Sequence, residues 1–260
     1  MQVIALIGSD SAAYALARYR DPQARLLLHV VPTGSVADAV RALPVLGFAG
    51  ALVFGDEARR EAAAACTRRS LDAEDLGAID VVTVAGDATL GDHVGGRAVV
   101  DGLRSGGWEP NGARVVALGT APGTRAVLRE LVADGAAEAT LVARDAPGAE
   151  RALPMLPAGA HGRPMAVHDP ALASVLERCD LLLRSEDLLA PDAALLGPHL
   201  TMVDLASDLA PALRTAGRDA GATTVVWSDV EAHRVASGLK AVVGGEVDVA
   251  SLHEAFLSAP

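Results

Sequence analysis

Three side chains in the first half of the chain have the chemistry for acid–base catalysis: Asp80, Asp92 and His93. Histidine titrates close to neutral pH, and a carboxylate that orients an imidazole makes a general acid–base pair. We therefore treat all three as candidate catalytic residues. The alternative is structural, because Asp92 and His93 can form a polar loop ahead of a helix while Asp80 accepts hydrogen bonds from backbone amides. Both interpretations stay open at this stage.

A second candidate site is the turn G-T-A-P-G-T at residues 119–124. The turn lies between an apolar run at 114–118 and an amphipathic segment at 125–134, and a second apolar run follows at 139–143. This order predicts a βαβ unit of the kind that binds the pyrophosphate of a dinucleotide.

The dinucleotide fingerprint G-x-G-x-x-G is degenerate in this turn. Only Gly119 keeps its place, while Ala121 and Thr124 replace the other two glycines. Arg144, at the end of the second apolar run, is placed to bind a ribose 2′-phosphate, which favours NADP over NAD; the alternative is a surface charge beside Asp145. The candidate cofactor-binding residues are Gly119, Thr120, Ala121, Thr124 and Arg144, and retention and loss of NADP binding are both open.

The elements that must position these residues alternate between strands and helices. Strands are predicted at 3–7, 25–31, 49–54, 79–84, 114–118, 139–143, 180–183, 200–204 and 223–227, with a short apolar run at 165–167. Helices are predicted at 11–19, 36–46, 56–66, 94–103, 125–134, 170–178, 209–216, 230–239 and 249–257, and 67–76 reads as a polar linker. The fold class is α/β: an N-terminal α/β domain with a largely parallel sheet, then a Rossmann-like doubly wound domain, with a cleft between them.

A cluster of glycine, proline and asparagine at 105–112 is the best candidate for a domain boundary. We expect an N-terminal domain over 1–104, joined by the C-terminal helix at 245–260. The Rossmann-like domain is expected over 105–244.

The amino-acid composition limits the classes of molecule that the protein is expected to bind. The formal net charge is −11 and no basic block is present, which argues against nucleic acid, and no apolar run is long enough to span a membrane. Cys66 and Cys179 are far apart and the histidines lack ligand spacing, so no metal site is expected. These features favour a cytoplasmic protein with a small-molecule ligand, and a homodimer is possible. Lys240 is the only lysine.

Several local strings, in a shared order and spacing over nearly the whole chain, resemble shikimate dehydrogenases. G-F-A-G at 47–50 resembles the family's G-F-x-G, and G-A-I-D-V-V at 77–82 resembles its G-A-V-N-T-V. The string L-G-D-H-V-G-G at 90–96 lies where the family has G-x-N-T-D-G. The string G-T-A-P-G-T-R-A at 119–126 lies where the family has G-A-G-G-A-A-R-A. The string A-R-D at 143–145 lies where the family has N-R-T, a motif that recognises NADP. The resemblance implies a two-domain NADP-dependent dehydrogenase.

The resemblance also shows what this chain lacks. The family uses a lysine and an aspartate for proton transfer at the reacting hydroxyl. The ungapped register places Ala58 at the lysine and Gly95 at the aspartate, although a shift of a few residues would bring Asp92 into play. Arg59 cannot replace the lysine, because a guanidinium stays protonated.

Substrate recognition is expected to differ as well. The S-x-S that holds the substrate carboxylate in the family corresponds to Ser9 and Ser11, and the family's neutral asparagine corresponds to Asp80. Added acids such as Asp56 repel a carboxylate substrate. The candidate substrate-binding residues are Ser9, Ser11, Asp56 and Arg59.

Three functions follow as expectations. The first is a diverged protein that has lost shikimate dehydrogenase activity, a pseudoenzyme in that sense, and performs non-redox acid–base chemistry on another small molecule in the interdomain cleft. The second is an NADP-dependent oxidoreductase with a substrate other than shikimate. The third is a non-catalytic binding or interaction protein.

Overall fold

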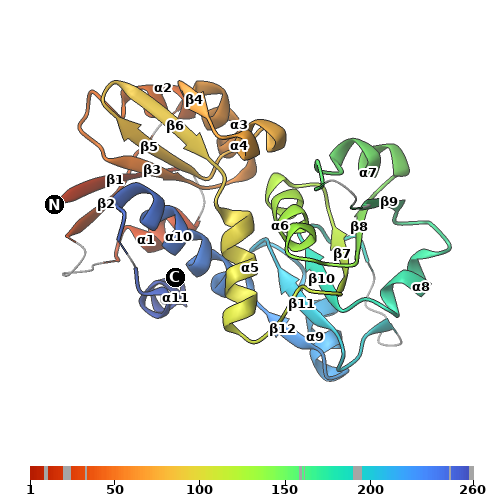
Figure 1. Ribbon diagram of the computed structural model, residues 1–260. Coiled ribbons are helices and arrows are strands. Elements are labelled where there is room, and N and C mark those ends of the chain that lie inside the picture. The colour runs from red at the N-terminus through yellow and green to blue at the C-terminus, as the bar shows by residue number, and fades with distance from the viewer. Residues whose placement is uncertain are drawn as a thin grey trace. The chain divides into compact units, whose positions relative to one another are not determined.

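The structure is a computed structural model of the 260-residue chain, and it describes residues 1–8, 11–19, 25–32, 34–157, 160, 162–189, 195–245 and 247–257. The chain divides into two compact units, which are described separately (Figure 1). Unit 1 comprises residues 1–98 and 231–260, and unit 2 comprises residues 99–230. The chain therefore leaves unit 1 within helix α5 (Gly95–Ser105) and returns to it within helix α10 (Trp227–Val243). The expected limits were 1–104 and 105–244, with 245–260 joined to the first domain.

Unit 1 is built on a mixed six-stranded sheet with the order β2-β1-β3-β5-β6-β4. Its strands are β1 (Gln2–Ile7), β2 (Leu26–Val30), β3 (Gly50–Val53), β4 (Arg68–Arg69), β5 (Val81–Ala85) and β6 (Ala88–Asp92). Its helices, besides most of α10, are α1 (Ser11–Leu16), α2 (Val36–Ala42), α3 (Asp56–Ala65), α4 (Leu71–Leu76) and α11 (Val249–Leu257). β1, β2 and β3 pair in parallel, whereas β5 is antiparallel to both β3 and β6.

Two sequence predictions in unit 1 were wrong. Residues 88–92, where no strand was predicted, form strand β6 of a hairpin with β5, and this hairpin makes the sheet mixed and not largely parallel. The predicted linker at 67–76 holds β4 and α4. Ser70 begins α4, because its Oγ accepts a hydrogen bond from the amide of Ala73 at 3.2 Å. Gly77 ends the helix in the left-handed conformation, at φ 64°.

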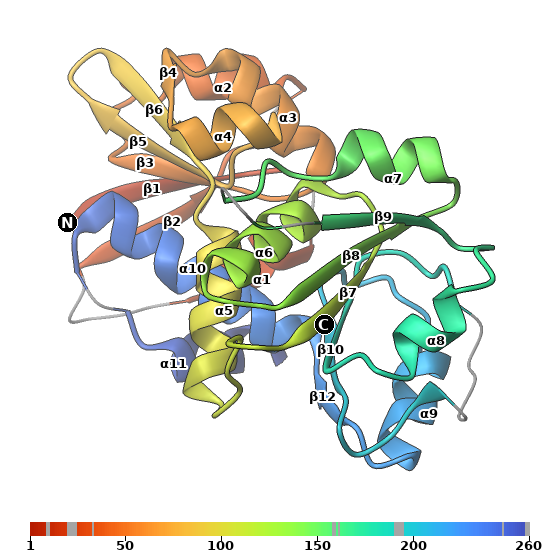
Figure 2. The same ribbon diagram turned by 45° about the vertical axis from the view of Figure 1, so that its right-hand side comes forward.

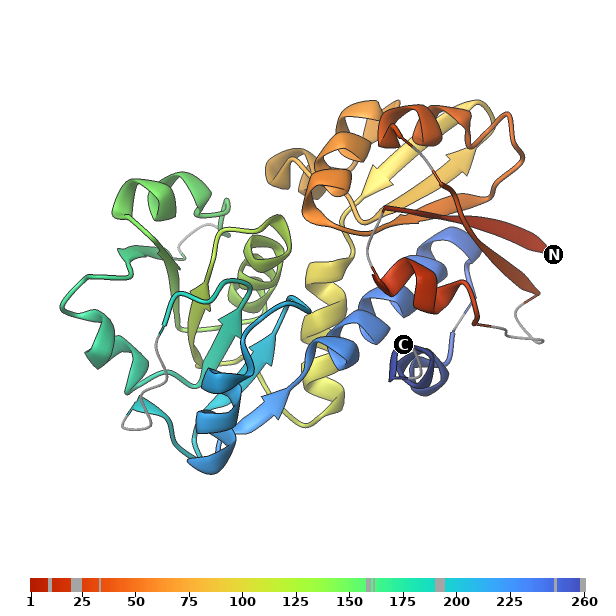
Figure 3. The ribbon, with the colours of Figure 1, turned by 180° about the vertical axis from the view of Figure 1, so that it is seen from behind.

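Helices cover both faces of the unit 1 sheet (Figures 1 and 3). On one face, alternate residues of β1 and β3, including Ala5, Ile7 and Val53, pack against α2, α3 and α4. On the other face α10 lies close to β3, since a Cβ atom on Gly238 would come within 2.6 Å of the side chain of Leu52. Small residues on α10 thus permit a close helix-to-sheet contact.

Unit 2 contains an all-parallel six-stranded sheet with the order β12-β11-β10-β7-β8-β9 (Figure 2). The strands are β7 (Arg114–Leu118), β8 (Glu138–Ala143), β9 (Gly162–Ala166), β10 (Leu181–Arg184), β11 (Thr201–Asp204) and β12 (Thr223–Val225). The helices, besides most of α5, are α6 (Pro122–Ala133), α7 (Ala146–Ala152), α8 (Leu172–Leu176) and α9 (Pro211–Asp219). Numbered within the unit, this is the order 6-5-4-1-2-3 of doubly wound dinucleotide-binding folds. The predicted Rossmann-like architecture is confirmed.

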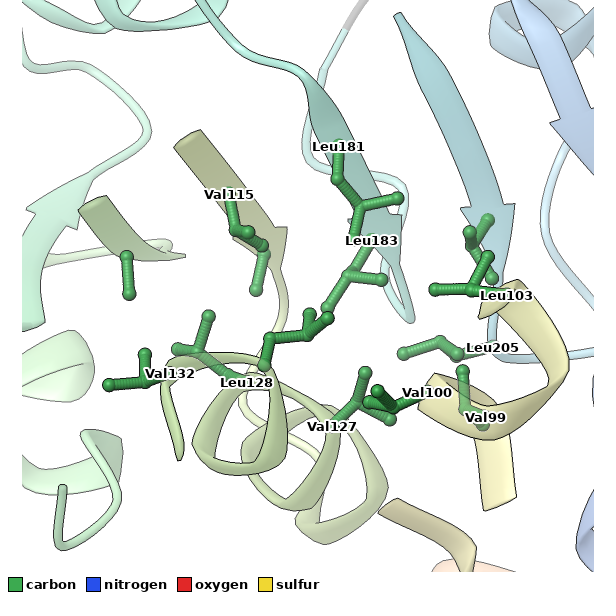
Figure 4. Packing of buried hydrophobic residues seen from close by; sticks show 14 of the residues in the cluster. Val99, Val100, Leu103, Val115, Val127, Leu128, Val132, Leu181, Leu183 and Leu205 are labelled. Carbon is green, nitrogen blue, oxygen red and sulfur yellow. The ribbon is translucent and has the colours of Figure 1, made fainter. Parts of the chain in front are cut away.

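The core of unit 2 has two layers, one on each face of its sheet. One layer joins α5 and α6 to inward-facing residues of β7, β8, β10 and β11, among them Val115 and Leu183 (Figure 4). The second layer joins α8 and α9 to the alternate residues of the same strands, among them Val116 and Leu182. Continuous apolar strands are expected in a parallel sheet that is covered on both faces.

The Ser70 cap provides a test of the corrected segment. We expect Ser70→Ala to lower the free energy of unfolding by about 1–2 kcal/mol, because it removes the acceptor for the Ala73 amide and a hydrogen bond from Ser70 to Asp92. Urea unfolding followed by circular dichroism measures this change. Ser70→Thr, which keeps a hydroxyl cap, is the control. Equal stability of the alanine and threonine variants would contradict the assignment of Ser70 as the N-cap of α4.

Candidate functional site

Asp80 follows α4 and precedes β5, and it is a buried carboxylate that receives the first amides of α5. The amide of Val94 donates to its Oδ1 at 2.9 Å, and the amide of Gly95 donates to its Oδ2 at 2.8 Å. Burial alone would raise the pKa of Asp80, but His93, Arg234 and Arg59 together outweigh burial and lower it. Asp80 is therefore ionised at neutral pH, and both of its oxygens hold the start of a helix.

His93 lies beside Asp80, with its Nδ1 3.6 Å from Asp80 Oδ2, a distance too long for a hydrogen bond. Its side chain is completely shielded from solvent, and neither ring nitrogen has a hydrogen-bond partner among the described residues. Burial lowers the pKa of His93, and Asp80 opposes that shift only in part. The imidazole is thus neutral at neutral pH, and it has no direct path to a dissolved substrate in this conformation.

Asp92 does not orient the imidazole. Its Oδ1 accepts hydrogen bonds from the Ser70 hydroxyl and, at 2.8 Å, from the backbone amide of His93. Strand pairing brings Asp92 opposite Val81, next to Asp80. The structure therefore gathers the three predicted acid–base residues in one place, but in contacts that fix the backbone.

Two buried ion pairs that the sequence analysis did not anticipate complete this cluster. Arg234 Nη1 donates to Glu231 at 3.3 Å, both residues being on α10, and Arg59 approaches Glu231 at 3.9 Å. Arg59 Nε also donates to the carbonyl of Val53 at 3.1 Å, so its side chain points into unit 1. Burial and the nearby Arg234 lower the pKa of Arg59. Arg234 keeps one buried nitrogen, Nη2, without a hydrogen-bond partner in the described part of the chain.

The position that the resemblance assigned to the catalytic aspartate has no room for any side chain. A Cβ atom on Gly95 would lie 2.4 Å from Asp80 Oδ2 and 2.8 Å from Arg234 Nε. The position assigned to the lysine, Ala58, lies on α3 at a surface pocket. Neither position carries a group that can exchange a proton.

That surface pocket opens at the ends of β1 and β3. Its described lining holds three carboxylates, Asp56, Glu57 and Glu61, together with the phenol of Tyr14, and it includes no lysine, arginine or histidine. Of the predicted substrate-binding residues, Asp56 lines this pocket, whereas the side chain of Arg59 is turned inward. Ser9 lies outside the described residues, and only the backbone of Ser11 is described, at the start of α1.

In unit 2 the turn after β7 accommodates its missing glycines. Gly119 has φ 108° and closely faces Ser185, since a Cβ atom there would lie 2.3 Å from Ser185 Oγ, so glycine is required. Ala121 has φ −56° and ψ 145°, which any residue adopts. Thr124 is buried and its hydroxyl donates to Ser185 Oγ at 2.7 Å. Pro122 is the first residue of α6, where a missing amide proton is tolerated.

A pocket lies beside this turn, at the carboxyl ends of β7 and β8. Three arginines line it: Arg144 directly after β8, Arg151 on α7 and Arg125 on α6. Arg125 is held in place by a hydrogen bond from its Nε to the carbonyl of Ala152 at 2.8 Å. The side chain of Arg144 is 82% exposed and therefore available to a ligand. These guanidinium groups suit a phosphate group.

Two carboxylates also line this pocket: Asp145, which follows Arg144, and Glu186, which enters from the segment after β10. Glu186 Oε1 accepts a hydrogen bond from the amide of Thr120 at 3.0 Å, and its Oε2 lies 3.9 Å from Arg144 Nε. Glu186 is not among the site residues predicted from the sequence. An acidic residue directly after a predicted parallel strand was the available signal, because such strand ends converge at one edge of a sheet.

Metal and thiol chemistry receive no support from the geometry. Within the described residues, no group of three or more histidine, cysteine, aspartate or glutamate side chains is placed to hold a metal ion. Cys66 and Cys179 are both free and buried, and burial raises the pKa of Cys179 to about 12. No helix in the described ranges has the length and apolar character needed to cross a membrane.

The two units together define a two-domain dehydrogenase-like fold, and solved structures share it. No known family profile matches the chain, and no curated protein sequence matches it. A shikimate dehydrogenase in complex with NADP+ aligns with a TM-score of 0.81 at 18% identity, over 98% of this chain and 94% of that chain. A 5-ketofructose reductase from a Gluconobacter strain aligns with a TM-score of 0.78 at 19% identity, over 98% of each chain. The quinate dehydrogenase of Corynebacterium glutamicum, in complex with NAD, aligns with a TM-score of 0.79 at 17% identity, over 99% of each chain.

The expected resemblance is therefore confirmed at the level of the fold. The chain has the fold of the shikimate and quinate dehydrogenases over nearly its whole length, at low sequence identity. That fold comprises one mixed sheet and one all-parallel Rossmann-like sheet.

The buried imidazole makes a pH-dependent prediction. The pKa of His93 in the folded chain lies below its ordinary value of 6.5, so the unfolded chain takes up a proton first as the pH falls. His93 therefore leaves the free energy of unfolding unchanged at pH values above 6.5. As the pH falls below 6.5, the free energy of unfolding decreases, by up to about 1.4 kcal/mol between pH 7.5 and 5.5. We expect His93→Leu to abolish this loss in denaturant unfolding. His168→Leu, at an exposed site, should follow the wild type, and an unchanged pH course for His93→Leu would refute the assignment.

Proposed function

We propose that this protein is an NADP-dependent oxidoreductase, related to the shikimate dehydrogenases, that acts on a substrate other than shikimate. The observation that carries the proposal is the pocket of unit 2, where the glycine turn after β7 lies beside three arginines, one each from the end of β8, α6 and α7. A parallel sheet with this strand order binds dinucleotides at the carboxyl ends of its strands. The fold similarity to dehydrogenases in complex with NADP+ and NAD supports the same conclusion.

The residues present fit the adenosine end of NADP. Arg144 and Arg151 would hold the ribose 2′-phosphate, and the turn with Gly119, Thr120, Ala121 and Thr124 would approach the pyrophosphate. Bound NADPH would supply hydride to a carbonyl carbon. The protein's own contribution is to bind and orient the cofactor through unit 2 and to select the substrate through unit 1.

The substrate we propose is an uncharged or cationic carbonyl compound or alcohol. Three carboxylates line the unit 1 pocket and its described residues offer no cation, so a carboxylate such as shikimate would be repelled. Arg59 offsets only part of this charge, because its side chain is turned inward and its Nη1 lies 3.7 Å from Asp56 Oδ1. The 5-ketofructose reductase named above, whose ketosugar is uncharged, is a precedent for such a substrate on this fold.

Non-redox chemistry by Asp80, Asp92 and His93 is a weaker candidate. The Asp80 and Asp92 carboxylates each accept backbone hydrogen bonds, and the His93 side chain is shielded from solvent. A substrate could reach the imidazole only after unit 1 opened locally. We therefore propose a structural role for these three residues, and a purely binding function becomes an outcome of the experiments below.

Cofactor binding is the first test. NADPH should bind the purified protein, seen as a change in its fluorescence, and should stabilise the fold by about 2.7 kcal/mol at one hundred times its dissociation constant. Arg144→Ala should raise the dissociation constant of NADPH about tenfold and that of NADH less than about twofold, because only NADPH carries the 2′-phosphate. Arg178→Ala, an exposed arginine outside the pocket, is the control. Absence of NADPH binding would refute the proposed function.

Substrate class is the second test. With NADP or NAD, we expect no turnover of shikimate or quinate. A panel of uncharged polyols and ketosugars should contain at least one substrate whose turnover changes the absorbance of NADPH. Efficient NADP-dependent oxidation of shikimate would show that the acidic pocket does not exclude carboxylates. The proposed substrate class would then be wrong even if the cofactor assignment held.

A further inference from the structure

We propose that Glu186 is the residue that sets the affinity of unit 2 for the diphosphate of its cofactor, by competing with phosphate oxygens for the turn after β7. The inference rests on the proposed NADP-binding function. It adds to that function a specific determinant of affinity, located after β10 and outside the turn itself.

The competition follows from the hydrogen bond between the turn and the carboxylate. Glu186 Oε1 accepts the amide of Thr120 at 3.0 Å, and this amide belongs to the turn that approaches a pyrophosphate in dinucleotide-binding folds. Pro122, two residues further on, cannot substitute for it, because proline has no amide proton. A phosphate oxygen can therefore reach the Thr120 amide only when the glutamate side chain has moved away.

Charge acts in the same direction as geometry. An ionised carboxylate and a diphosphate repel each other strongly at contact distance in a partly shielded pocket. Glu186 also lies 3.9 Å from Arg144, so it partly neutralises one of the three cations that line the pocket. The carboxylate thus occupies a donor and weakens a cation that a phosphate ligand would use.

The backbone next to Glu186 is fixed, which limits what can move. The amide and the hydroxyl of Ser185 both donate to the carbonyl of Leu118, at 2.9 Å and 3.1 Å, and the hydroxyl of Thr124 donates to Ser185 Oγ. The side chain of Glu186 is 34% exposed and has solvent to rotate into. Binding of a diphosphate therefore requires rotation of this side chain and no displacement of the segment.

The experiment compares four ligands on four proteins. Isothermal titration calorimetry would measure the dissociation constants of NADPH, NADH, ADP and adenosine for the wild type, Glu186→Gln and Glu186→Ala. Glutamine keeps an oxygen acceptor for the Thr120 amide and removes the charge, so the turn should stay intact. Glu177→Gln, an exposed glutamate at the end of α8, changes the net charge equally and is the matched control.

We expect both Glu186 variants to bind NADPH, NADH and ADP about tenfold more tightly than the wild type, with the affinity for adenosine unchanged. The three tightened ligands share a diphosphate and adenosine lacks one. Glu177→Gln should match the wild type for all four ligands.

Two results would overturn the inference. If the wild type binds NADPH and the Glu186 variants bind it equally or more weakly, the carboxylate supports the turn and does not compete, while the proposed function stands. If no protein in the set binds NADPH, NADH or ADP, the inference and the proposed function both fail.

Discussion

An ionised carboxylate inside unit 1 is the constraint on which the rest of that unit depends. Removing a charge from water costs several kcal/mol unless other groups replace the lost solvation. Asp80 obtains this replacement from the amides of Val94 and Gly95 at the start of α5, and from the nearby Arg234 and Arg59. The arrangement requires β5, β6, α5 and α10 to meet at one point, and it leaves no space for a side chain at Gly95. α5 and α10 are also the helices in which the chain passes from one unit to the other.

Each unit has a carboxylate that accepts hydrogen bonds from the backbone near the start of a helix, but the two carboxylates differ in how firmly they are held. In other proteins this position, near the start of a helix, binds anionic ligands, whereas here a side chain of the protein itself occupies it. Asp80 is only 8% exposed and is compensated on several sides, so we regard its role as architectural. Glu186 sits in an open pocket and is compensated by one amide and one distant arginine. A ligand can replace the second carboxylate at little cost, but not the first.

The sequence predicts much of the fold because most elements are apolar and regularly spaced. The parallel strands of unit 2 are examples, and the turn at Gly119 correctly marks their centre. Strand β6 was not predicted because threonine, glycine and aspartate interrupt its apolar pattern, although the Gly86-Asp87 turn before it is a hairpin signal. The site was less predictable. Arg59 meets Glu231, and Glu186 meets the Thr120 amide, only through tertiary folding, and no local pattern shows that His93 is sealed from solvent.

The two cysteines have a practical consequence for work in solution. A thiol reacts with oxidants and maleimides as its thiolate, and a thiol with a pKa of about 12, as for Cys179, is in that form only about once in 10⁵ molecules at neutral pH. Cys66 is buried as well, and burial raises its pKa too. The natural chain therefore provides a background of low thiol reactivity. A single cysteine introduced on its surface would carry a fluorescent or spin label selectively, without prior removal of the native thiols.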